Sequence, residues 1–498
     1  MPAPPATLVR LMRPLVVLEA CVVTGWLALA GASLFDRGDP LPVLDAAALA
    51  VGPTEETWMG LYLDGQHIGW SRAREAAAAD GGRVFEQSSS FKLAAMGTVQ
   101  EIVAAGSALT DAGGHIRQFS FLLSAPARIV GTGTYTDGNI VLDVTQAGST
   151  SRMTIPVGEA PVIGSSSTAS LRGRTLAPGL RFEVPWFDPL TRTNSRAEVT
   201  VEAPEVLPDG TTGWWMRTRV SGFETRKLVD AEGRVLREEG AMGLRAVAMS
   251  RENALAVDAG DPPDLVALAS VPLEGPAPQG SRVTYVVSGV EPERLPSEPP
   301  LQIREGDRVV VSVPLVQELP RGLPVRADPE GNADELAASP SLPVHHPEIV
   351  ARADAIVGDA PDRVEAARRL HDWVFRNVQK VPTIGLPNGL EVLRSGKGDC
   401  NEHTALYVSL ARAAGLPSRI AAGLVYSARV GEAFYYHAWP EVRIGPTGAD
   451  GLPGWVPVDP TLGQFPADGS HLKLVTGDLD RQVEIMGLMG RIRLRVAG

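Results

Sequence analysis

Three side chains toward the end of the sequence have the types and the spacing that thiol catalysis requires. Cys400 directly follows Asp399, and because aspartate is a preferred N-cap residue, this cysteine is predicted to lie in the first turn of a helix. At that position the helix dipole favours negative charge and is expected to lower the pKa of the thiol. The thiolate is the nucleophilic form of cysteine, so Cys400 is the predicted nucleophile.

An imidazole and a carboxylate follow Cys400 at separations that allow them to complete a catalytic site. A thiol nucleophile needs an imidazole to take its proton and to protonate a leaving amine, and His437, on a predicted strand, is the leading candidate. Asp459 closes the next predicted strand and is expected to orient the imidazole. The separations, 37 residues from position 400 to 437 and 22 from 437 to 459, leave room for one helix and two strands.

Three motifs surround these residues in the order GDCNEHTALYVSLARAAGLPSRIAAGLVY, YYHAWPEVRI and GWVPVDPT. Together they resemble the transglutaminase-like superfamily over roughly Arg363 to Leu474, and the run DPTLGQFPADGSHLKL is similar to its bacterial, membrane-anchored members. The resemblance implies a papain-like α+β fold and a catalytic triad of Cys400, His437 and Asp459. It also implies that the thiolate attacks a carboxamide or peptide carbonyl, and that water or an amine resolves the thioester.

Two classes of function are compatible with these motifs. The first is a transglutaminase-like thiol enzyme that acts on protein or peptide amide bonds through a Cys thioester, as a hydrolase (cysteine protease or amidase) or as a transferase (transamidase). The second is an envelope binding or scaffold protein whose triad is vestigial. All three triad residues are present, which favours the enzyme. The backbone N–H of Cys400 is then expected to stabilise the oxyanion.

No cofactor and no metal ion is predicted. The pair His345-His346 has no cysteine or carboxylate at ligand spacing, so an exposed loop is expected there. Some animal relatives use calcium, but the sequence has no acidic loop with the spacing of a calcium site.

Several other side chains near the motifs are expected to have structural positions. Glu402 is expected to be a first-turn carboxylate that the helix dipole favours, and His403 a helix-packing or surface residue. Trp439 is expected in the core, and Glu441 at the surface on the same sheet face as His437. His471 lies in a family-like segment, but the sequence alone supports no role for it.

The elements that must position these residues follow an α+β order in a predicted catalytic domain, residues 344–498. Apolar residues recur at three- and four-residue steps over residues 364–378 and predict a helix that begins near Asp359. A second helix is predicted over residues 400–414. The strands predicted after it are residues 418–426, 433–442 and 455–458.

Two segments precede this domain. Residues 50–257 are predicted to form a β-rich antiparallel domain, because short apolar or alternating stretches flank Asp-Gly pairs that suit tight hairpins. These pairs are Asp64-Gly65, Asp137-Gly138 and Asp209-Gly210. Residues 258–343 are predicted to be Pro-rich linkers with a small β-module, since proline excludes one long helix.

Residues 1–36 are predicted to be a cytoplasmic stub and one transmembrane helix. The run of 21 residues over 15–35 is apolar except for Glu19, which is long enough to cross the hydrocarbon core of a bilayer. Arg10 and Arg13 precede it, so the positive-inside rule places the rest of the chain outside the cytoplasm.

A retained signal anchor is the preferred interpretation of this segment. It predicts a single-pass protein of the cell membrane with a periplasmic or extracellular catalytic part. A cleaved signal peptide is the main alternative, because Ala28-Leu29-Ala30 resembles a cleavage site. A lipoprotein modified at Cys21 is less favoured, because Glu19 interrupts the required pattern.

The composition excludes other classes of protein. The 498 residues include 46 Lys plus Arg and 58 Asp plus Glu, a net charge of −12, which argues against electrostatic binding of nucleic acid. With Cys21 in the predicted membrane segment, the exported part holds one thiol, Cys400, and cannot form an internal disulfide. The expected partners are the protein or peptide substrate that the resemblance implies and the membrane that residues 15–35 are predicted to cross.

Overall fold

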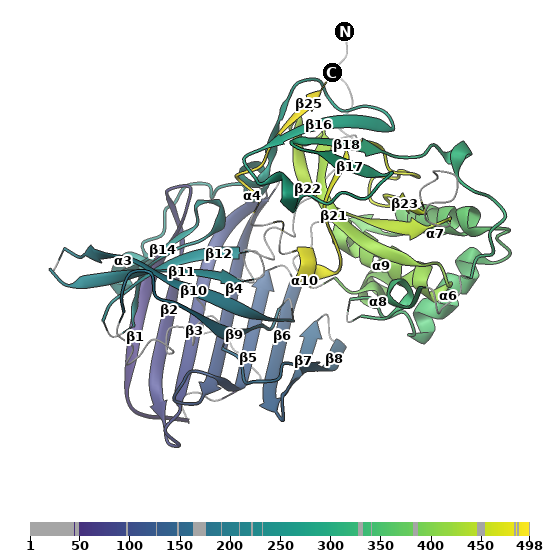
Figure 1. The fold of residues 1–498 in the computed structure, drawn as a ribbon. Coiled ribbons are helices and arrows are strands. Elements are labelled where there is room, and N and C mark those ends of the chain that lie inside the picture. The colour runs from purple at the N-terminus through teal and green to yellow at the C-terminus, as the bar shows by residue number, and fades with distance from the viewer. Residues whose placement is uncertain are drawn as a thin grey trace, which may run out of the picture. The chain divides into compact units, whose positions relative to one another are not determined.

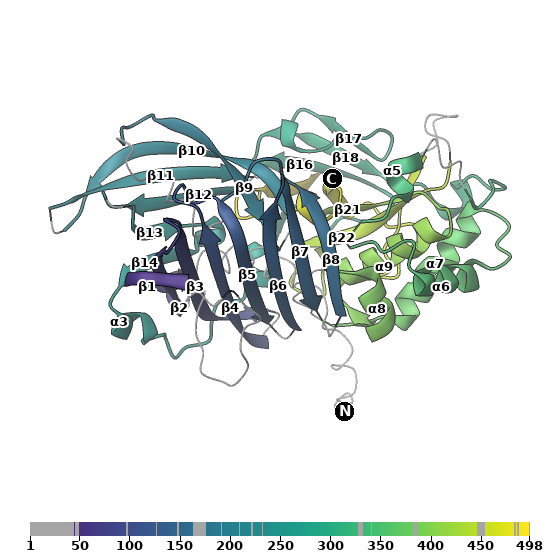
Figure 2. The same ribbon diagram turned by 90° about the horizontal axis from the view of Figure 1, so that it is seen from below.

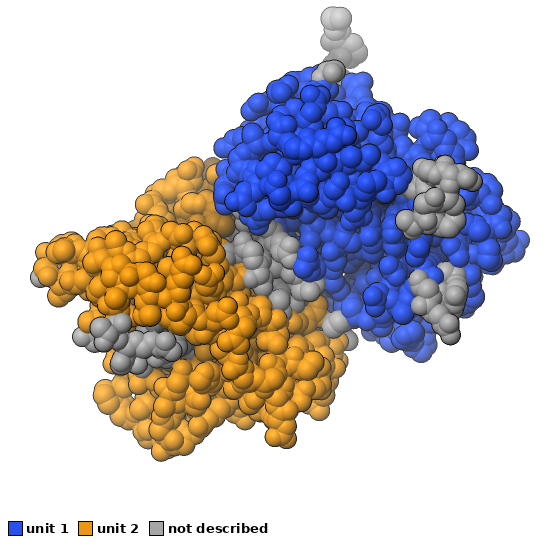
Figure 3. All heavy atoms as spheres, viewed as in Figure 1, with its two compact units in different colours: residues 1–18, 269–498 blue, residues 19–268 orange. Residues whose placement is uncertain are grey.

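The chain folds into two compact units in the computed structural model, coloured differently in Figure 3. The N-terminal unit comprises residues 19–268, and the C-terminal unit comprises residues 269–498 together with residues 1–18. The structure describes residues 44, 49–95, 98–125, 127–146, 149–162, 176–190, 192–208, 210–220, 223–231, 233–326, 332–339, 341–381, 387–445, 454–482, 485 and 488–497.

The predicted transmembrane segment, residues 15–35, lies outside the described residues. Among the helices of the described part, none has the length and apolar character that a membrane span requires. The membrane helix therefore stays a prediction from sequence.

One antiparallel sheet of 14 strands makes up most of the N-terminal unit, which confirms the predicted β-rich region (Figure 1, Figure 2). Strands β1 to β8 are neighbours in chain order, strands β9 to β14 likewise, and β1 pairs with β14 to join the two runs. The strands are β1 (Ala50–Leu63), β2 (Gln66–Ala78), β3 (Arg83–Ala95), β4 (Thr98–Thr110), β5 (Ile116–Ala125), β6 (Ala127–Thr136), β7 (Asn139–Gln146), β8 (Ser149–Pro156), β9 (Arg181–Asp188), β10 (Thr193–Val206), β11 (Thr212–Val220), β12 (Phe223–Val229), β13 (Val235–Glu239) and β14 (Arg245–Met249).

Two of the predicted hairpin turns are confirmed by their backbone angles. Asp64 and Gly65 have φ angles of 49° and 81°, and Asp137 and Gly138 have φ angles of 49° and 78°. Positive φ at both central residues is the geometry of the two-residue turn that Asp-Gly favours, because it matches the twist of the flanking strands. The third predicted turn includes Asp209, which lies outside the described residues, between the antiparallel strands β10 and β11.

A mixed sheet of nine strands runs through the C-terminal unit in the order β17-β18-β16-β25-β15-β22-β21-β24, with β23 paired to β22. Strands β16 to β18 come from the Pro-rich region, and β25 lies between them and the strands that carry the predicted site. The strands are β15 (Val271–Glu274), β16 (Arg282–Ser288), β17 (Gln302–Glu305), β18 (Arg308–Ser312), β21 (Ser418–Ser427), β22 (Ala433–Arg443), β23 (Trp455–Pro457), β24 (His471–Thr476) and β25 (Arg493–Ala497). The strands predicted at 418–426, 433–442 and 455–458 agree with β21, β22 and β23 to within one residue at each end.

Helices on one side of this sheet enclose an apolar core. The longer ones are α6 (Pro347–Val357), α7 (Arg363–Asn377), α8 (Gly389–Ser395) and α9 (Cys400–Ala413). The predicted start of α7 near Asp359 is wrong, because the Asp362 carboxylate accepts from the backbone N–H of Glu365 at 2.9 Å and is the N-cap. Asp359 instead pairs with the Arg369 guanidinium at 2.9 Å.

One edge of β22 is left open at its centre, and this opening admits the start of α9. On that edge β15 pairs with the first two residues of β22 and β23 pairs with the last three, so in the described chain residues 435–439 have no strand partner there. The backbone carbonyl of Ala438 accepts from the Thr404 hydroxyl at 3.1 Å instead. The interrupted pairing therefore brings the first turn of α9 to the middle of the strand that carries His437.

Gly423 allows β24 to approach β21 closely. It pairs with His437 on one side and with Lys473 on the other. A Cβ atom at this position would lie 2.1 Å from the backbone oxygen of Leu472. The absence of a side chain at Gly423 thus allows the close spacing of β21 and β24, the strand that carries His471.

We expect Gly423→Ala to lower the free energy of unfolding of the C-terminal unit by about 1–3 kcal/mol or more, since backbone atoms of β24 must move to admit the methyl group. Urea unfolding of the full chain measures this. Gly260→Ala is the matched control, because a Cβ at Gly260 meets no atom within 4 Å. Equal stability of the two variants would contradict this account of Gly423.

Candidate active site

Cys400 is the first residue of α9, and two reciprocal hydrogen bonds fix the start of this helix. The Asp399 carboxylate accepts from the backbone N–H of Asn401 at 2.9 Å, and the Glu402 carboxylate accepts from the backbone N–H of Asp399 at 3.0 Å. This capping box explains why the helix begins at the predicted residue. Glu402, expected only to favour the helix dipole, is therefore buried and defines the helix start.

The Cys400 thiol is buried, and its pKa does not follow the prediction from sequence. Burial and the charge of Asp399 raise the pKa of the Cys400 thiol well above its ordinary value, and Glu402 and Asp459 act in the same direction. The backbone N–H of Ala438 opposes them, because it can donate to a thiolate. The predicted lowering of the pKa is thus wrong, and the thiol needs a base that takes its proton as it reacts.

Asn401 and Tyr436 lie beside the sulfur atom. The Asn401 side-chain amide donates to Cys400 Sγ at 3.6 Å, and its oxygen lies 3.4 Å from the Tyr436 hydroxyl. The same hydroxyl donates to Gln482 Oε1 at 2.8 Å. Since Cys400, Asn401, Tyr436 and Gln482 are all buried, this chain holds the Asn401 amide against the sulfur in a site with little water.

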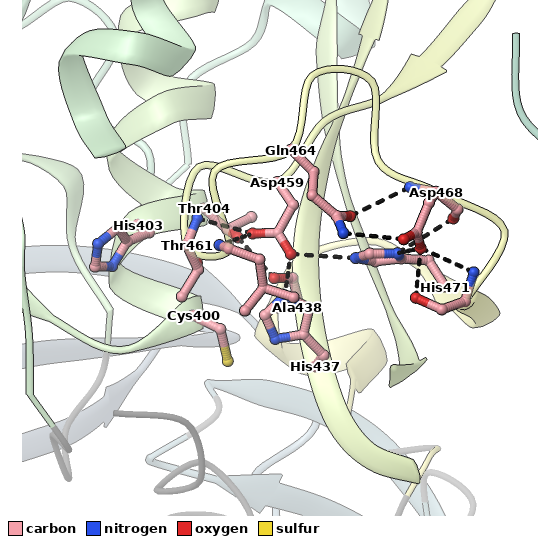
Figure 4. Close-up of polar contacts among 12 residues, drawn as sticks. Cys400, His403, Thr404, His437, Ala438, Asp459, Thr461, Gln464, Asp468 and His471 are labelled. Carbon is pink, nitrogen blue, oxygen red and sulfur yellow. Dashed lines mark hydrogen bonds and ion pairs between the residues drawn. The ribbon is translucent and has the colours of Figure 1, made fainter. Parts of the chain in front are cut away.

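His437 and Asp459 are brought together as the sequence predicts for an imidazole and its orienting carboxylate. Nε2 of His437 lies 2.7 Å from Oδ2 of Asp459, and both side chains are completely buried. A nitrogen at this distance from a carboxylate carries the proton, so the lone pair of the neutral ring is on Nδ1. Within the part of the chain that the structure describes, Nδ1 is buried and has no hydrogen-bond partner. In Figure 4 the Cys400 side chain points to the side on which the His437 ring lies.

Asp459 is held by hydrogen bonds from several elements. Its Oδ1 accepts from the backbone N–H groups of Thr461 and Leu462, both at 2.8 Å, and its backbone carbonyl lies 3.1 Å from Nε2 of His371 on α7. Burial opposes ionisation of Asp459, but the imidazoles of His437 and His471 hold its pKa well below the usual value. The carboxylate is therefore ionised and fixed in place.

His471 lies in the site, although no role could be argued for it from the sequence. Its Nε2 lies 3.1 Å from Oδ2 of Asp459, the oxygen that also accepts from His437, and its Nδ1 lies 3.4 Å from Oδ1 of Asp468 (Figure 4). Burial opposes protonation, yet the hydrogen bonds to Asp459 and Asp468 raise the pKa of His471 to about 9. The Trp439 ring packs edge-on against it, with centroids 5.1 Å apart. The one sequence signal for His471 was its place in the family-like run that follows Asp459.

Nitrogen and oxygen atoms of His437, Asp459 and His471 lie within 4.8 Å of one another, a spacing that a metal ion could use. Hydrogen bonds at 2.7 and 3.1 Å already account for these same atoms, and all three side chains are buried. The hydrogen bonds therefore explain why these three side chains lie so close together, and no metal ion is needed for that.

The structure also places three other histidines that the sequence singled out. His403 is buried in α9, where its Nδ1 lies 2.6 Å from the Asp399 carbonyl, and burial lowers its pKa to about 4. His346 caps α6 by accepting from the backbone N–H of Glu348 at 3.3 Å, while His345 beside it is exposed. His403 is thus a helix-packing residue, one of the two alternatives that the sequence left open.

Glu441 is not at the surface, contrary to the prediction. It shares the face of β22 with His437, as predicted, but it is buried and pairs with Lys473 at 2.8 Å and with Arg419 at 2.6 Å. Glu298, which precedes β17, also pairs with Lys473 at 2.8 Å. Two cations and two carboxylates therefore neutralise one another, and their ion pairs connect β21, β22 and β24.

Comparisons with known proteins give one family match and several similar solved structures. Residues 350–460 match the family model described as the transglutaminase-like superfamily. No curated protein matches the chain. Among solved structures, a proposed cysteine protease from Cytophaga hutchinsonii has 16% identity and a TM-score of 0.28, covering 45% of this chain and 82% of that one. A β-barrel-like domain of unknown function from Brucella abortus has 12% identity and a TM-score of 0.31, covering 41% of this chain and 98% of that one.

Proposed function

We propose that the transglutaminase-like domain in the C-terminal unit is a thiol enzyme that cleaves or exchanges amide bonds of proteins or peptides through a thioester on Cys400. The observation that carries the proposal is the hydrogen bonding of the two His437 ring nitrogens. Nε2 is hydrogen-bonded to Asp459 at 2.7 Å, while the buried Nδ1 has no hydrogen-bond partner in the described structure and can act as a base. The raised pKa of Cys400 makes such a base necessary.

Acylation then needs one proton transfer in each direction. Nδ1 of His437 takes the thiol proton as Sγ forms a bond to the carbonyl carbon, and the carbonyl oxygen becomes an oxyanion. When the oxyanion collapses, the C–N bond breaks and the His437 imidazolium gives its proton to the leaving amine. Asp459 keeps the ring oriented in both steps. Water or a second amine then gives a proton to His437 and attacks the thioester carbon. The C–S bond breaks, and His437 returns that proton to the sulfur of Cys400.

The oxyanion has two candidate donors at the start of α9. The backbone N–H of Cys400 is at the positive end of the helix dipole. The Asn401 side-chain amide, 3.6 Å from the sulfur, is close to the place where the oxyanion forms beside it. These two groups are the arrangement that stabilises tetrahedral intermediates of acyl transfer.

Asn401→Ala is expected to lower kcat by about 10²–10³-fold with little change of KM, because an oxyanion donor acts in the transition state and not in substrate binding. Steady-state kinetics measure this. Tyr436→Phe is the control, since it keeps the amide and removes only the hydroxyl 3.4 Å from its oxygen. A rise in KM at unchanged kcat for the Asn401 variant would contradict the assignment.

The resolving nucleophile decides between hydrolysis and transamidation. The test is mass spectrometry of an envelope extract incubated with the full chain and a labelled primary amine. New shortened peptides that depend on Cys400 indicate a protease, and amine-labelled proteins indicate a transamidase. If neither product depends on Cys400, the chain does not act on amide bonds and a binding or scaffold role remains.

We also propose that residues 15–35 anchor the protein in the cell membrane, with both units exported. The support is the apolar run and the arginines before it. A reporter enzyme that is active only outside the cytoplasm, fused after residue 36, is expected to be active and to sediment with membranes. Activity in the soluble fraction would indicate cleavage, and an inactive fusion would contradict export.

A further inference from the structure

One carboxylate oxygen in the site accepts two hydrogen bonds from imidazoles. Oδ2 of Asp459 lies 2.7 Å from Nε2 of His437 and 3.1 Å from Nε2 of His471. The second ring reaches this oxygen from β24, two strands away from β22. A catalytic triad needs only the first of these bonds, so the second requires an explanation.

We propose that His471 is a positively charged positioning residue that shares Asp459 with His437 and, by balancing its charge, keeps His437 neutral and able to act as a base. This inference rests on the proposed function of Cys400, because it concerns the base of the same reaction. It predicts four interacting groups in the site, Cys400, His437, Asp459 and His471, in which the last one never touches the substrate.

The groups that face His471 favour its positive charge. Asp459 lies on one side of the ring and Asp468 on the other, at 3.1 and 3.4 Å. Asp468 is itself fixed by the backbone N–H of Ser470 at 2.9 Å. The nearest cation on the same strand, Lys473, is paired with Glu441 and Glu298. These contacts agree with a pKa of His471 raised to about 9.

The charge of His471 acts directly on His437. The centroids of the two rings are 5.8 Å apart, and both side chains are buried, so solvent screens their repulsion only weakly. An ionised Asp459 alone would favour the imidazolium form of His437. With His471 protonated, the Asp459–His471 pair has no net charge, so it attracts a second proton to the His437 ring less strongly.

The test is the pH dependence of Cys400 reactivity in the full chain carrying Cys21→Ser, which leaves Cys400 as its one thiol. Alkylation by iodoacetamide, and kcat/KM where turnover is found, should both fall below a limiting pH at which His437 becomes protonated. His471→Gln keeps a hydrogen-bond donor but removes the charge. We expect this variant to move the limiting pH, the acid limb of the profile, upward by roughly one pH unit or more. Alkylation at a pH below the limb should then be about tenfold slower than in the unsubstituted chain.

His371→Gln is the matched control, because His371 contacts the backbone carbonyl of Asp459 and not its carboxylate. We expect its acid limb to stay in place. A His471→Gln protein that loses activity with an unmoved acid limb would show a merely structural role and overturn the proposal. Alkylation needs no substrate, so a shifted alkylation limb without turnover would support the role of His471 while contradicting the proposed function.

A measurement on the unsubstituted chain covers the case in which His471→Gln does not fold. Nitrogen-15 spectra of the histidine rings at pH 8 should contain one imidazolium protonated at both nitrogens. If every histidine ring is neutral at that pH, His471 carries no charge and the proposal is wrong.

Discussion

Cys400→Ala is expected to lower kcat by at least about 10⁴-fold, to the level of the uncatalysed background, while the protein stays folded. In the proposed reaction the sulfur forms the thioester, and Cys400 is the free cysteine of the described part of the chain. The substitution removes one buried atom at a helix start that Asp399 and Glu402 define independently, so we expect the free energy of unfolding to change by about 1 kcal/mol or less.

The measurement is turnover in the amine-labelling and peptide-release assays, together with urea unfolding. Cys21→Ala is the matched control, since it removes the other cysteine of the chain and should leave turnover unchanged. Persistent turnover in the Cys400 variant would refute the thiol mechanism. Loss of both turnover and folding would instead show that the cysteine is needed for packing.

Asp459→Asn is expected to lower kcat by about 10³–10⁴-fold, because an amide cannot hold His437 with Nε2 protonated and Nδ1 free as well as a carboxylate does. It should also destabilise the C-terminal unit at neutral pH, since His471 loses one of its two carboxylate partners. Asp468→Asn, which removes the other partner, is the control and should affect kcat far less.

The stability effect of Asp459 has a defined pH dependence. Its pKa in the folded protein lies well below the unfolded value, so its contribution is complete above about pH 4 and is lost as the pH falls. The unfolding free energies of the wild type and Asp459→Asn should therefore converge in acid. A difference that stays constant from pH 7 to pH 3 would show that the carboxylate charge does not stabilise the fold.

Short sequence patterns predict the turns and the helix start, because interactions among neighbouring residues determine these features. The Asp-Gly pairs predict hairpins because few residues other than glycine and aspartate adopt positive φ easily. Asp399 and Glu402 predict the start of α9, and with it the position of Cys400, because a helix cap is complete within four residues. His437 and Asp459 were found through motif order, and the structure places them in contact.

The remainder depends on strand register, which short sequence patterns do not encode. Glu441 was predicted at the surface, and it is buried with Lys473 because β21, β22 and β24 align the two side chains on one face. His471 reaches Asp459 only because β24 pairs with β21 and Gly423 allows the strands to approach. The direction of the Cys400 pKa shift could not be predicted either. The helix dipole follows from the local sequence, but the burial that raises this pKa depends on the tertiary fold.

The position of β25 has a consequence for the order of folding. Residues 493–497 pair with β16 on one side and with β15 on the other, so β25 joins β16 to β18, from residues 282–312, to β15 and through it to β22, which carries His437. During synthesis, about 180 residues are added between β18 and β25, so β16 to β18 cannot pair with the rest of the sheet until those residues have been made. A nascent chain thus cannot complete the sheet that includes the strand of His437 until residue 497 has been made.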